Sequence, residues 1–445
     1  MSLEWNSYTI GESCELITGF PFKSKYYLDE GLFKVVRGDN VKEGFIKWDD
    51  KKRCWNELND KLKKVILKEE DIVIGMDGSK LGKNRATISK KDLPALLAQR
   101  VACVRAKEGF DQNYIKYVIL SNYFKSYVDK VKTGTSIPHI SLGQISEFTF
   151  EAPDYKKQKT ISSILSTIDK KITVNQEINK NLEQLMKCIF EDWFVNFNYS
   201  EDISFKSSEL GEIPSNWNVK KLSDVLITLE SGKRPKGGIS DIEDGIPSIG
   251  AENILGLGKF NYSKNKLISH EFFSTLKKGV IQDKDVLLYK DGAQLGRKSL
   301  FMKGFPFDIC CINEHVFRLQ TNDEINQFYL YLWLDQEVMT NEIINLNSNS
   351  AQPGINQNDV KSLPILVPEL KIIGKFNKII SPMMNQIFDN ALEINKLTKL
   401  RDTLLPKLMS GEIDVSKINC DLELKYKYMK YLFNQIHTPM SKSVV

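Results

Sequence analysis

The chain has 445 residues, of which 41% are hydrophobic and 27% are charged, a composition typical of folded globular proteins rather than disordered or fibrous ones. Its length suggests about three compact units, or two large ones connected by helices. No apolar stretch reaches the ~18 residues that a membrane span needs, and the first residues form no apolar signal segment. The net charge of +5 permits nucleic-acid binding through local basic patches without requiring it.

Cofactor and metal motifs are missing from the sequence. The seven cysteines are scattered without a Cys-x-x-Cys pair, which predicts reduced thiols in a cytoplasmic protein. With only four histidines, we expect no metal site and no His-based catalytic centre. The nearest approach to a phosphate-binding loop, residues 78–83, is one residue short and is followed by Asn84 instead of Ser or Thr. The Asn-Pro-Pro-aromatic loop of amino-methyltransferases is absent, so we expect no catalytic residue and no cofactor bound by this chain.

In chain order, the first predicted elements are strands. Alternating apolar residues at 33–36, 71–74 and 100–104, interrupted by Gly and Asp turns, are typical of half-buried strands. Residues 113–131 have helical spacing, and a similar pattern runs from 326 to about 344. We expect the aromatic side chains of both helical patterns to pack in a core.

Two long heptad patterns follow these mixed regions. Steps of four and three residues through 161–193 meet apolar side chains at eight of ten positions, and the same steps through 376–408 do so as well. Asn175 and Asn390 occupy the same place in the two patterns. The shared register predicts two helices that pack on each other through a coiled-coil seam, rather than two unrelated surface helices. Pro382 is expected to kink the second helix or to mark its first turn.

The whole chain is a tandem repeat with an offset of about 214 residues. Asp77-Gly-Ser-Lys-Leu-Gly-Lys83 aligns with Asp291-Gly-Ala-Gln-Leu-Gly-Arg297, and Trp5-Asn6 aligns with Trp217-Asn218. The predicted fold is α+β: two similar mixed α/β domains joined by two long helices in an antiparallel coiled coil with pseudo-twofold symmetry. The expected boundaries are 1–154 and 198–368 for the mixed domains, with a linker at 198–213, 155–197 and 369–412 for the helices, and 413–445 for a C-terminal extension.

Several motifs, in this order and spacing, carry a resemblance to a known family. They are Gly134-Thr-Ser-Ile-Pro-His-Ile140 with its partner Asn349-Ser-Ala-Gln-Pro-Gly-Ile355, the restart Gly211-Glu-Ile-Pro-Ser-Asn-Trp217, and Leu404-Leu-Pro-Lys-Leu-Met-Ser-Gly-Glu-Ile413 at the end of the second helix. Over about residues 1–412 the chain resembles the DNA-specificity subunit of type I restriction–modification systems. It departs from that pattern where the second helix opens with Glu369-Leu-Lys instead of a Gln-Lys pair, and in residues 414–445, which have no counterpart in the repeat.

The resemblance implies a function and a set of partners. Each mixed domain would be a target-recognition domain that reads one half of a split double-stranded DNA sequence. Two methyltransferase subunits would bring S-adenosylmethionine, restriction subunits would use ATP and Mg, and no membrane would be involved. A stand-alone DNA-modifying or DNA-cleaving enzyme, using carboxylates such as Asp77 and Asp291, is the alternative, although repeated Asp-Gly suits a turn better. A third hypothesis is a coiled-coil scaffold without DNA contact.

The coiled coil would set the distance between the two half-sites. A helix of about 36 residues spans roughly 54 Å, which is about one and a half turns of a duplex that repeats every ~34–36 Å. In an antiparallel pair with equal register, Asn175 and Asn390 flank the pseudo-dyad, so we predict that they lie close together near the centre of the coil and penalise slipped alignments.

Candidate DNA-binding residues are those in basic, Gly-rich loops between strands, since Arg, Lys, Asn and Gln read bases and Lys and Arg bind phosphates. By contrast, the repeated Gly-Asp-Asn-Val and Ala-Glu-Asn-Ile stretches suit turn capping by Asp39, Asn40, Glu252 and Asn253 better than base contact. Residues 232–238 form the best single basic patch. The predicted DNA-binding residues are Lys23, Lys25, Arg37, Lys80, Lys83, Arg85, Lys132, His139, Lys233, Arg234, Lys236, Lys290, Gln294, Arg297 and Lys298.

Overall fold

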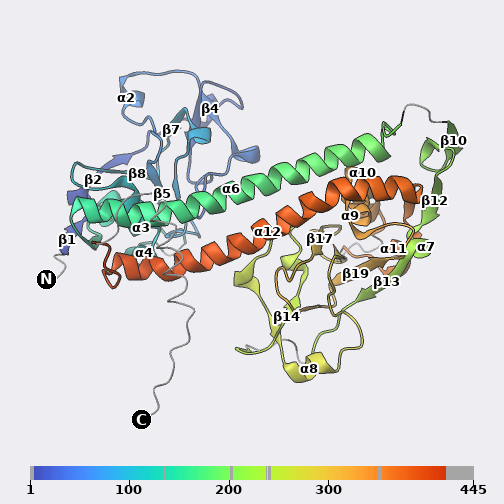
Figure 1. The fold of residues 1–445 in the computed structure, drawn as a ribbon. Helices are drawn as coiled ribbons and strands as arrows, with labels where there is room; N and C mark the ends of the chain where they lie inside the picture. The colour runs from blue at the N-terminus through green and yellow to red at the C-terminus, as the bar shows by residue number, and fades with distance from the viewer. Residues whose placement is uncertain are drawn as a thin grey trace, which may run out of the picture. The chain divides into compact units, whose positions relative to one another are not determined.

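The computed structural model describes residues 5–134, 136–200, 204–236, 238, 242–347 and 353–416 (Figure 1). The chain divides into two compact units: one contains residues up to Lys170 and residues from Thr398 on, and the other is Lys171–Leu397. Each unit therefore combines one mixed domain with part of each long helix, α6 (Tyr155–Phe194) and α12 (Leu370–Met409). Nearly all of the C-terminal extension, and residues 349–352 of the predicted motif, lie outside the described residues.

The first unit is built on three sheets with strand orders β2-β8-β5-β6, β4-β3-β7 and β1-β9 among its described residues. Its strands are β1 (Asn6–Thr9), β2 (Cys14–Thr18), β3 (Phe33–Val36), β4 (Cys54–Trp55), β5 (Ile72–Gly75), β6 (Arg85–Thr87), β7 (Ala95–Leu97), β8 (Val101–Ala106) and β9 (Thr149–Ala152). Its shorter helices are α1 (Ile10–Ser13), α2 (Asp60–Lys63), α3 (Gln112–Leu120), α4 (Asn122–Val131) and α5 (Leu142–Ser146), with 3₁₀ turns η1 (Ser24–Tyr26), η2 (Asp49–Lys51) and η3 (Lys90–Asp92).

The second unit repeats this plan with the orders β13-β19-β16-β17, β15-β14-β18 and β12-β20, and adds the hairpin β10-β11. Its strands are β10 (Phe205–Ser208), β11 (Gly211–Pro214), β12 (Asn218–Lys221), β13 (Leu226–Ser231), β14 (Ile246–Ile249), β15 (Leu267–Ile268), β16 (Asp285–Tyr289), β17 (Lys298–Phe301), β18 (Cys311–Ile312), β19 (Val316–Thr321) and β20 (Pro364–Val367). Its shorter helices are α7 (Leu222–Val225), α8 (His270–Ser274), α9 (Gln327–Asp335), α10 (Glu337–Asn345) and α11 (Gln357–Ser362), with 3₁₀ turns η4 (Ala251–Asn253) and η5 (Tyr262–Lys264).

The identical strand orders confirm the duplication and the α+β class. In both units the four-stranded sheet is antiparallel, and the neighbouring three-stranded sheet contains one parallel pair, β3 with β7 and β14 with β18. Each residue of β5 is buried because the strand has a neighbour on both edges and packed side chains on both faces. The predicted strands at 33–36, 71–74 and 100–104 correspond to β3, β5 and β8.

The helix predicted at 113–131 is two helices. Ser121 ends α3 and begins α4 with an extended backbone, and its side chain accepts a hydrogen bond from the backbone N–H of Phe124. Gln336 separates α9 from α10 in the same way, although its side chain makes no such cap. Continuous apolar spacing does not detect such a break, because the two helices keep their buried faces on the same core.

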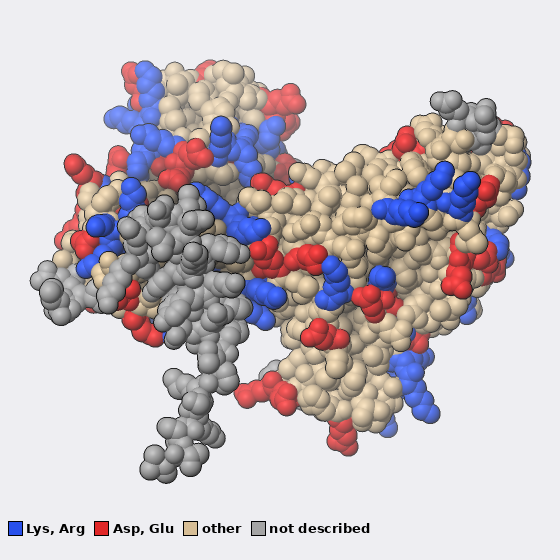
Figure 2. Space-filling model, viewed as in Figure 1, with Lys and Arg blue, Asp and Glu red and all other residues tan. Residues whose placement is uncertain are grey.

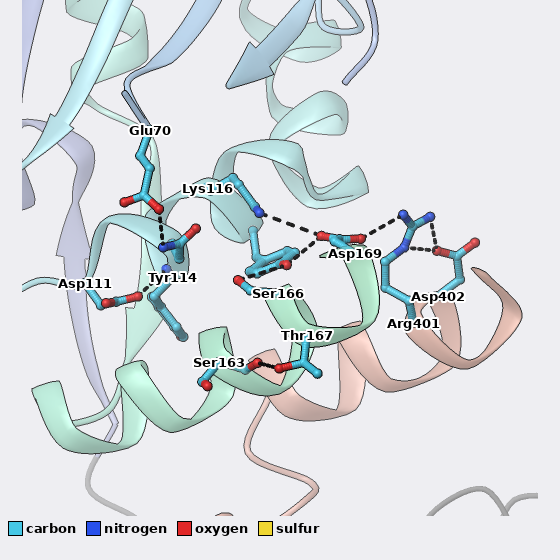
Figure 3. Close-up of polar contacts among 12 residues, drawn as sticks. Glu70, Asp111, Tyr114, Lys116, Ser163, Ser166, Thr167, Asp169, Arg401 and Asp402 are labelled. Carbon is cyan, nitrogen blue, oxygen red and sulfur yellow. Dashed lines mark hydrogen bonds and ion pairs between the residues drawn. The ribbon is translucent and has the colours of Figure 1, made fainter. Parts of the chain in front are cut away.

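In the first unit, α3 is attached to the long helices through Asp169 of α6. The Tyr117 hydroxyl donates to Asp169 at 2.6 Å, and the ammonium of Lys116 lies 3.7 Å from the same carboxylate (Figure 3). Arg401 of α12 donates to Asp169 at 3.2 Å. Burial lowers the pKa of Lys116, and burial together with the nearby Asp169 charge raises the pKa of Tyr117. The one charged position of the predicted seam, Arg401, is thus paired with a carboxylate.

In the second unit, buried asparagines connect the two long helices. Asn390 donates to the side-chain oxygen of Asn179 at 2.8 Å, and Asn179 donates to the carbonyl of Ile387 at 3.1 Å. Asn175 donates to Glu393 at 2.7 Å. The residue numbers of the partners decrease along α12 as they increase along α6, which confirms that the two helices pack antiparallel. Reflection through the seam midpoints places Asn390 opposite Asn179, one turn along α6 from Asn175, so Asn175 and Asn390 lie near each other as predicted, each bonded to a different partner on the facing helix.

The seam itself deviates from strict heptads near the end of α6. Phe190 and Phe194 are buried there, whereas the predicted Ile189 and Trp193 are only half-buried. The two phenylalanines also pack on Tyr329 of α9, with ring centroids 5.4 and 4.9 Å apart. In a straight α-helix, positions seven residues apart gradually rotate away from the seam. At this end of α6, the additional contact with α9 favours burial of Phe190 and Phe194, each one position beyond the predicted seam residue.

The second long helix does not begin at Pro382. Instead, α12 runs continuously from Leu370 to Met409, with Pro382 on its exposed side. Water can solvate the carbonyl group that a proline leaves without a donor at such a position.

Candidate nucleic-acid interface

The loops of the first unit gather where its parallel strands β3 and β7 end. Residues 37–40 follow β3, and Gln99 and Arg100 follow β7. The hairpin loop between β5 and β6 lies beside them: the Met76 N–H donates to the Arg100 carbonyl at 2.9 Å, and the Gly78 N–H donates to the Pro138 carbonyl at 3.0 Å. These contacts bring the described residues of the predicted motif at 134–140 against the Asp-Gly loop at residues 77–78.

A basic hollow of about 530 Å³ opens between these loops and helix α4. Two acidic residues, Glu43 and Asp129, also line it. Asp129 is bound by Lys132 at 2.9 Å and by Lys125 at 3.5 Å, and the hydrogen bond from Lys132 lowers the pKa of Asp129. The lysines around the hollow are Lys42, Lys47, Lys80, Lys83, Lys125 and Lys132. Lysines concentrated in a concave surface attract the phosphates of a nucleic acid.

Figure 2 shows Lys and Arg side chains gathered over the part of the first unit that carries α2, β4 and β7 in Figure 1. Lys23 and Lys25 are exposed at η1, and the ammonium of Lys25 lies 4.8 Å from the ring centre of Tyr26. Arg37 is half-buried and donates to the Lys51 carbonyl at 2.8 Å, which limits its reach.

The remaining predicted side chain of these loops is that of His139, which is exposed. Its ring Nε2 lies 3.0 Å from the Thr133 hydroxyl. Its backbone forms bridges with both Asp77 and Thr133.

The prediction that Arg85 reaches DNA is corrected by its burial. The residue lies on β6 and is 3% exposed. Its guanidinium donates to the carbonyls of Ile119 and Ser121 at 2.5 and 2.9 Å, at the junction of α3 and α4, and burial lowers the pKa of Arg85 to about 10. Arg85 therefore satisfies carbonyl groups at a helix end that would otherwise lack donors.

The second unit has an equivalent loop cluster after β14 and β18. The Lys290 N–H donates to the His315 carbonyl at 3.1 Å, and the Gly292 N–H donates to the Pro353 carbonyl at 2.7 Å, which repeats the pattern of the first unit. The His315 ring Nδ1 is hydrogen-bonded to the Asp291 carboxylate, and Lys290 lies 2.8 Å from the same group. Both carboxylates of the enzyme hypothesis, Asp77 and Asp291, are thus engaged in ion pairs or hydrogen bonds.

Most of the predicted cations of the second unit are exposed. Arg234 lies 3.6 Å from Glu314, and the ammonium of Lys290 lies 5.5 Å from the ring centre of Phe317. The exposed predicted side chains are Lys233, Arg234, Lys236, Gln294 and Arg297.

Of the other two, Lys290 is half-buried and Lys298 is buried: Lys298 is 4% exposed on β17 and donates to the hydroxyl of Thr340. Burial lowers the pKa of Lys298 to about 8. Its assignment as a DNA-facing lysine is corrected in the same way as that of Arg85.

The turn-capping interpretation of the repeated Asn is confirmed. Asn40 accepts from the Arg37 N–H at 3.1 Å, and Asn253 accepts from the Gly250 N–H at 3.2 Å; both asparagines are buried. Neither side chain is free to contact a base.

Several residues that the structure brings into the loop clusters carry no clear signal in the sequence. Three are the hollow lysines Lys42, Lys47 and Lys125, which lie in segments without a Gly-rich signal. The other two, Arg100 and His315, are the last residues before β8 and β19. In the sequence, both residues look like parts of the strands that follow them. Only alignment of the two repeats would have shown that they occupy equivalent positions.

A duplicated α+β chain with basic loops at matching places in both copies has the architecture of a nucleic-acid-binding protein. Residues 2–184 and 214–402 match the family model described as the type I restriction modification DNA specificity domain, and the chain belongs to this family.

Curated relatives cover much of the chain. The MjaVIII specificity subunit of Methanocaldococcus jannaschii is 26% identical over 432 residues, which is 94% of this chain and 94% of that protein. The MjaIX specificity subunit of the same organism is 23% identical over 314 residues, 70% of this chain and 71% of that protein. The crystal structure of the S subunit from M. genitalium has a TM-score of 0.57 at 17% identity and covers 92% of this chain and 96% of that one, which supports the fold.

The described residues contain no helix that is both long enough and apolar enough to cross a lipid bilayer.

Proposed function

We propose that this chain is the DNA-reading, non-catalytic subunit of a type I restriction–modification complex, and that each mixed domain reads one half of a split double-stranded target. The observation that carries the proposal is the duplication of the loop cluster at the ends of the parallel strands, together with membership of the DNA specificity family. Two copies of a reader on one chain suit a target with two separate halves.

The partners follow from this role. Two methyltransferase subunits would bind the chain and supply S-adenosylmethionine, and restriction subunits would supply ATP hydrolysis with Mg. The chain itself would hold no cofactor, and the complex would act in the cytoplasm. The long helices would set the number of unread base pairs between the half-sites, with Asn179 and Asn390 stabilising one alignment.

Genome-wide mapping of methylated bases tests the proposal in a host that carries this gene and a methyltransferase partner. The expected pattern is two short sequence elements separated by a fixed number of unspecified bases. A contiguous motif would contradict two separate readers. As a further test of the spacer, one heptad added to each long helix should lengthen the unread segment by roughly three base pairs, since seven residues rise about 10 Å.

The competing enzyme hypothesis has its own test. The purified chain is incubated with duplex DNA, Mg, ATP and S-adenosylmethionine, with and without the partner subunits. Methyl transfer or cleavage by the chain alone would refute a non-catalytic role. The scaffold hypothesis predicts an affinity for DNA that does not depend on salt, whereas a DNA reader weakens steeply as salt rises.

A further inference from the structure

An exposed arginine is held by a carboxylate at the centre of the first loop cluster. Arg100 lies between β7 and β8, immediately before β8, and its guanidinium donates to Asp77 at 2.8 Å. Asp77 immediately precedes residues 78–83 of the hairpin loop, which border the basic hollow. The Arg100 side chain is 69% exposed, so most of its N–H donors face outward while one is fixed by Asp77.

Stability does not account for this arrangement. An ion pair as exposed as that of Arg100 and Asp77 contributes little to folding. Arg100 also has a φ of 64°, in the left-handed region that costs free energy for a residue with a side chain. Strain of this kind persists where the surrounding structure imposes it, and it concentrates at binding sites.

The second unit keeps the carboxylate but changes its partner. Asp291 is the counterpart of Asp77, and His315 occupies the place of Arg100, with its carbonyl accepting the equivalent backbone hydrogen bond. His315 is not among the residues with positive φ. Both domains therefore present a carboxylate-held side chain at one position, and the side chain differs between them.

An ion pair at the other end of the same sheet shows what a structural pair does. Arg105 binds Asp71 through two hydrogen bonds of 2.8 and 2.7 Å, and in the second unit Arg318 binds Asp285 at the matching place. Both carboxylates are buried. This structural pair is identical in the two repeats, in contrast to the exposed pair at the loops. Two domains that share a scaffold and read different half-sites should differ at the positions that contact bases.

We infer that Arg100 is a specificity-determining residue that reads a guanine in the major groove, with Asp77 as the positioning residue that orients it. The inference rests on the proposed function. An arginine donates two parallel hydrogen bonds to O6 and N7 of guanine, a pattern that no other base pair offers in the major groove. A neighbouring carboxylate fixes the guanidinium plane before DNA binds, which reduces the rotamer entropy lost on binding.

The experiment uses the complex reconstituted from this chain and its methyltransferase partner. The target is first mapped with the wild-type complex, and equilibrium affinities are then measured at one salt concentration for duplexes with a single base pair replaced. In Arg100→Ala, discrimination at one G·C pair should fall roughly 5- to 140-fold, the factor that corresponds to ~1–3 kcal/mol, while the other positions keep theirs. Arg100→Lys should lose nearly as much, because lysine keeps the charge but lacks the planar fork. Asp77→Asn should cause a smaller loss at the same base pair.

The matched control is Lys407→Ala, which removes another exposed ion pair, with Glu412 just after α12 and outside the loop cluster. It should leave the base preferences unchanged, and an effect equal to that of Arg100→Ala would overturn the inference. A uniform loss of affinity at all positions that Arg100→Lys restores would mean a phosphate contact and would also overturn it, as would unchanged preferences in Arg100→Ala. If the wild-type complex has no split target, the proposed function fails instead, so the two failures are distinguishable.

Discussion

The buried lysine of the second unit makes stability depend on pH in an unusual direction. Lys298 has an ordinary pKa of 10.5 that burial lowers to about 8, with Asp335 opposing and Lys187 reinforcing the shift. Between these values the unfolded chain still binds a proton that the folded chain has released. The free energy of unfolding therefore rises with pH in this window, and the penalty for burying the charge is fully present below about pH 8.

The size of the effect follows from the shift. A displacement of about 2.5 pKa units corresponds to about 3 kcal/mol between the two limits. Over the narrower range from pH 7 to pH 9, the lysine should add about 1 kcal/mol to the free energy of unfolding. Lys298→Met removes this dependence. At pH 7 it should also stabilise the second unit by about 1–2 kcal/mol, because the charge penalty outweighs the lost hydrogen bond to Thr340.

Urea unfolding at pH 7, 8 and 9 measures the effect through the fluorescence of Trp193, Trp217 and Trp333, which all lie in the second unit. The quantity of interest is the difference between wild type and Lys298→Met at each pH, since other titrating groups cancel in it. If the difference stays constant from pH 7 to pH 9, the assignment of a lowered pKa to Lys298 is refuted.

Two further predictions concern the helix pair and the hollow. Replacing Asn179 or Asn390 alone by leucine should destabilise the second unit by about 1–3 kcal/mol, since each change leaves a buried amide without its partner, and replacing both should recover most of that loss in a double-mutant cycle. Replacing Lys80, Lys83 and Lys132 together by alanine should reduce the slope of log K against log salt by about 3 on duplexes of any sequence; an unchanged slope would contradict phosphate binding in the hollow.

Features set by periodicity and by internal repetition were predictable from the sequence. The strands at 33–36, 71–74 and 100–104 and the heptad seam come from alternation or spacing along a single segment. The repeat then supplied what one segment could not: the same architecture twice, and the antiparallel packing of the long helices. The break at Ser121 escaped because a helix cap leaves the apolar spacing almost unchanged.

The depth of a cation in the fold was not predictable. Arg85 and Lys298 follow Gly-rich loops, which suggests exposure, yet both lie on the outer strands β6 and β17 with side chains turned toward helices. The sequence does not specify which face of a two-to-four-residue strand a helix will cover. Arg100 was missed for a related reason, since its partner Asp77 is 23 residues away and only the folded loops bring the two together.

The two repeats separate the residues that hold the domain together from those that tell one half-site from the other. At the end of the sheet opposite the loop cluster, a buried carboxylate binds an arginine in both units. Removing either partner would leave an uncompensated charge in the interior. Divergence is therefore costly there. At the loops, an exposed side chain on a retained carboxylate can change from Arg100 to His315 at little cost in stability. A duplicated DNA-recognition domain can therefore acquire a second specificity through substitutions in the loops alone. Asp77 and Asp291 keep the same role in both domains, while the side chain that each one binds differs.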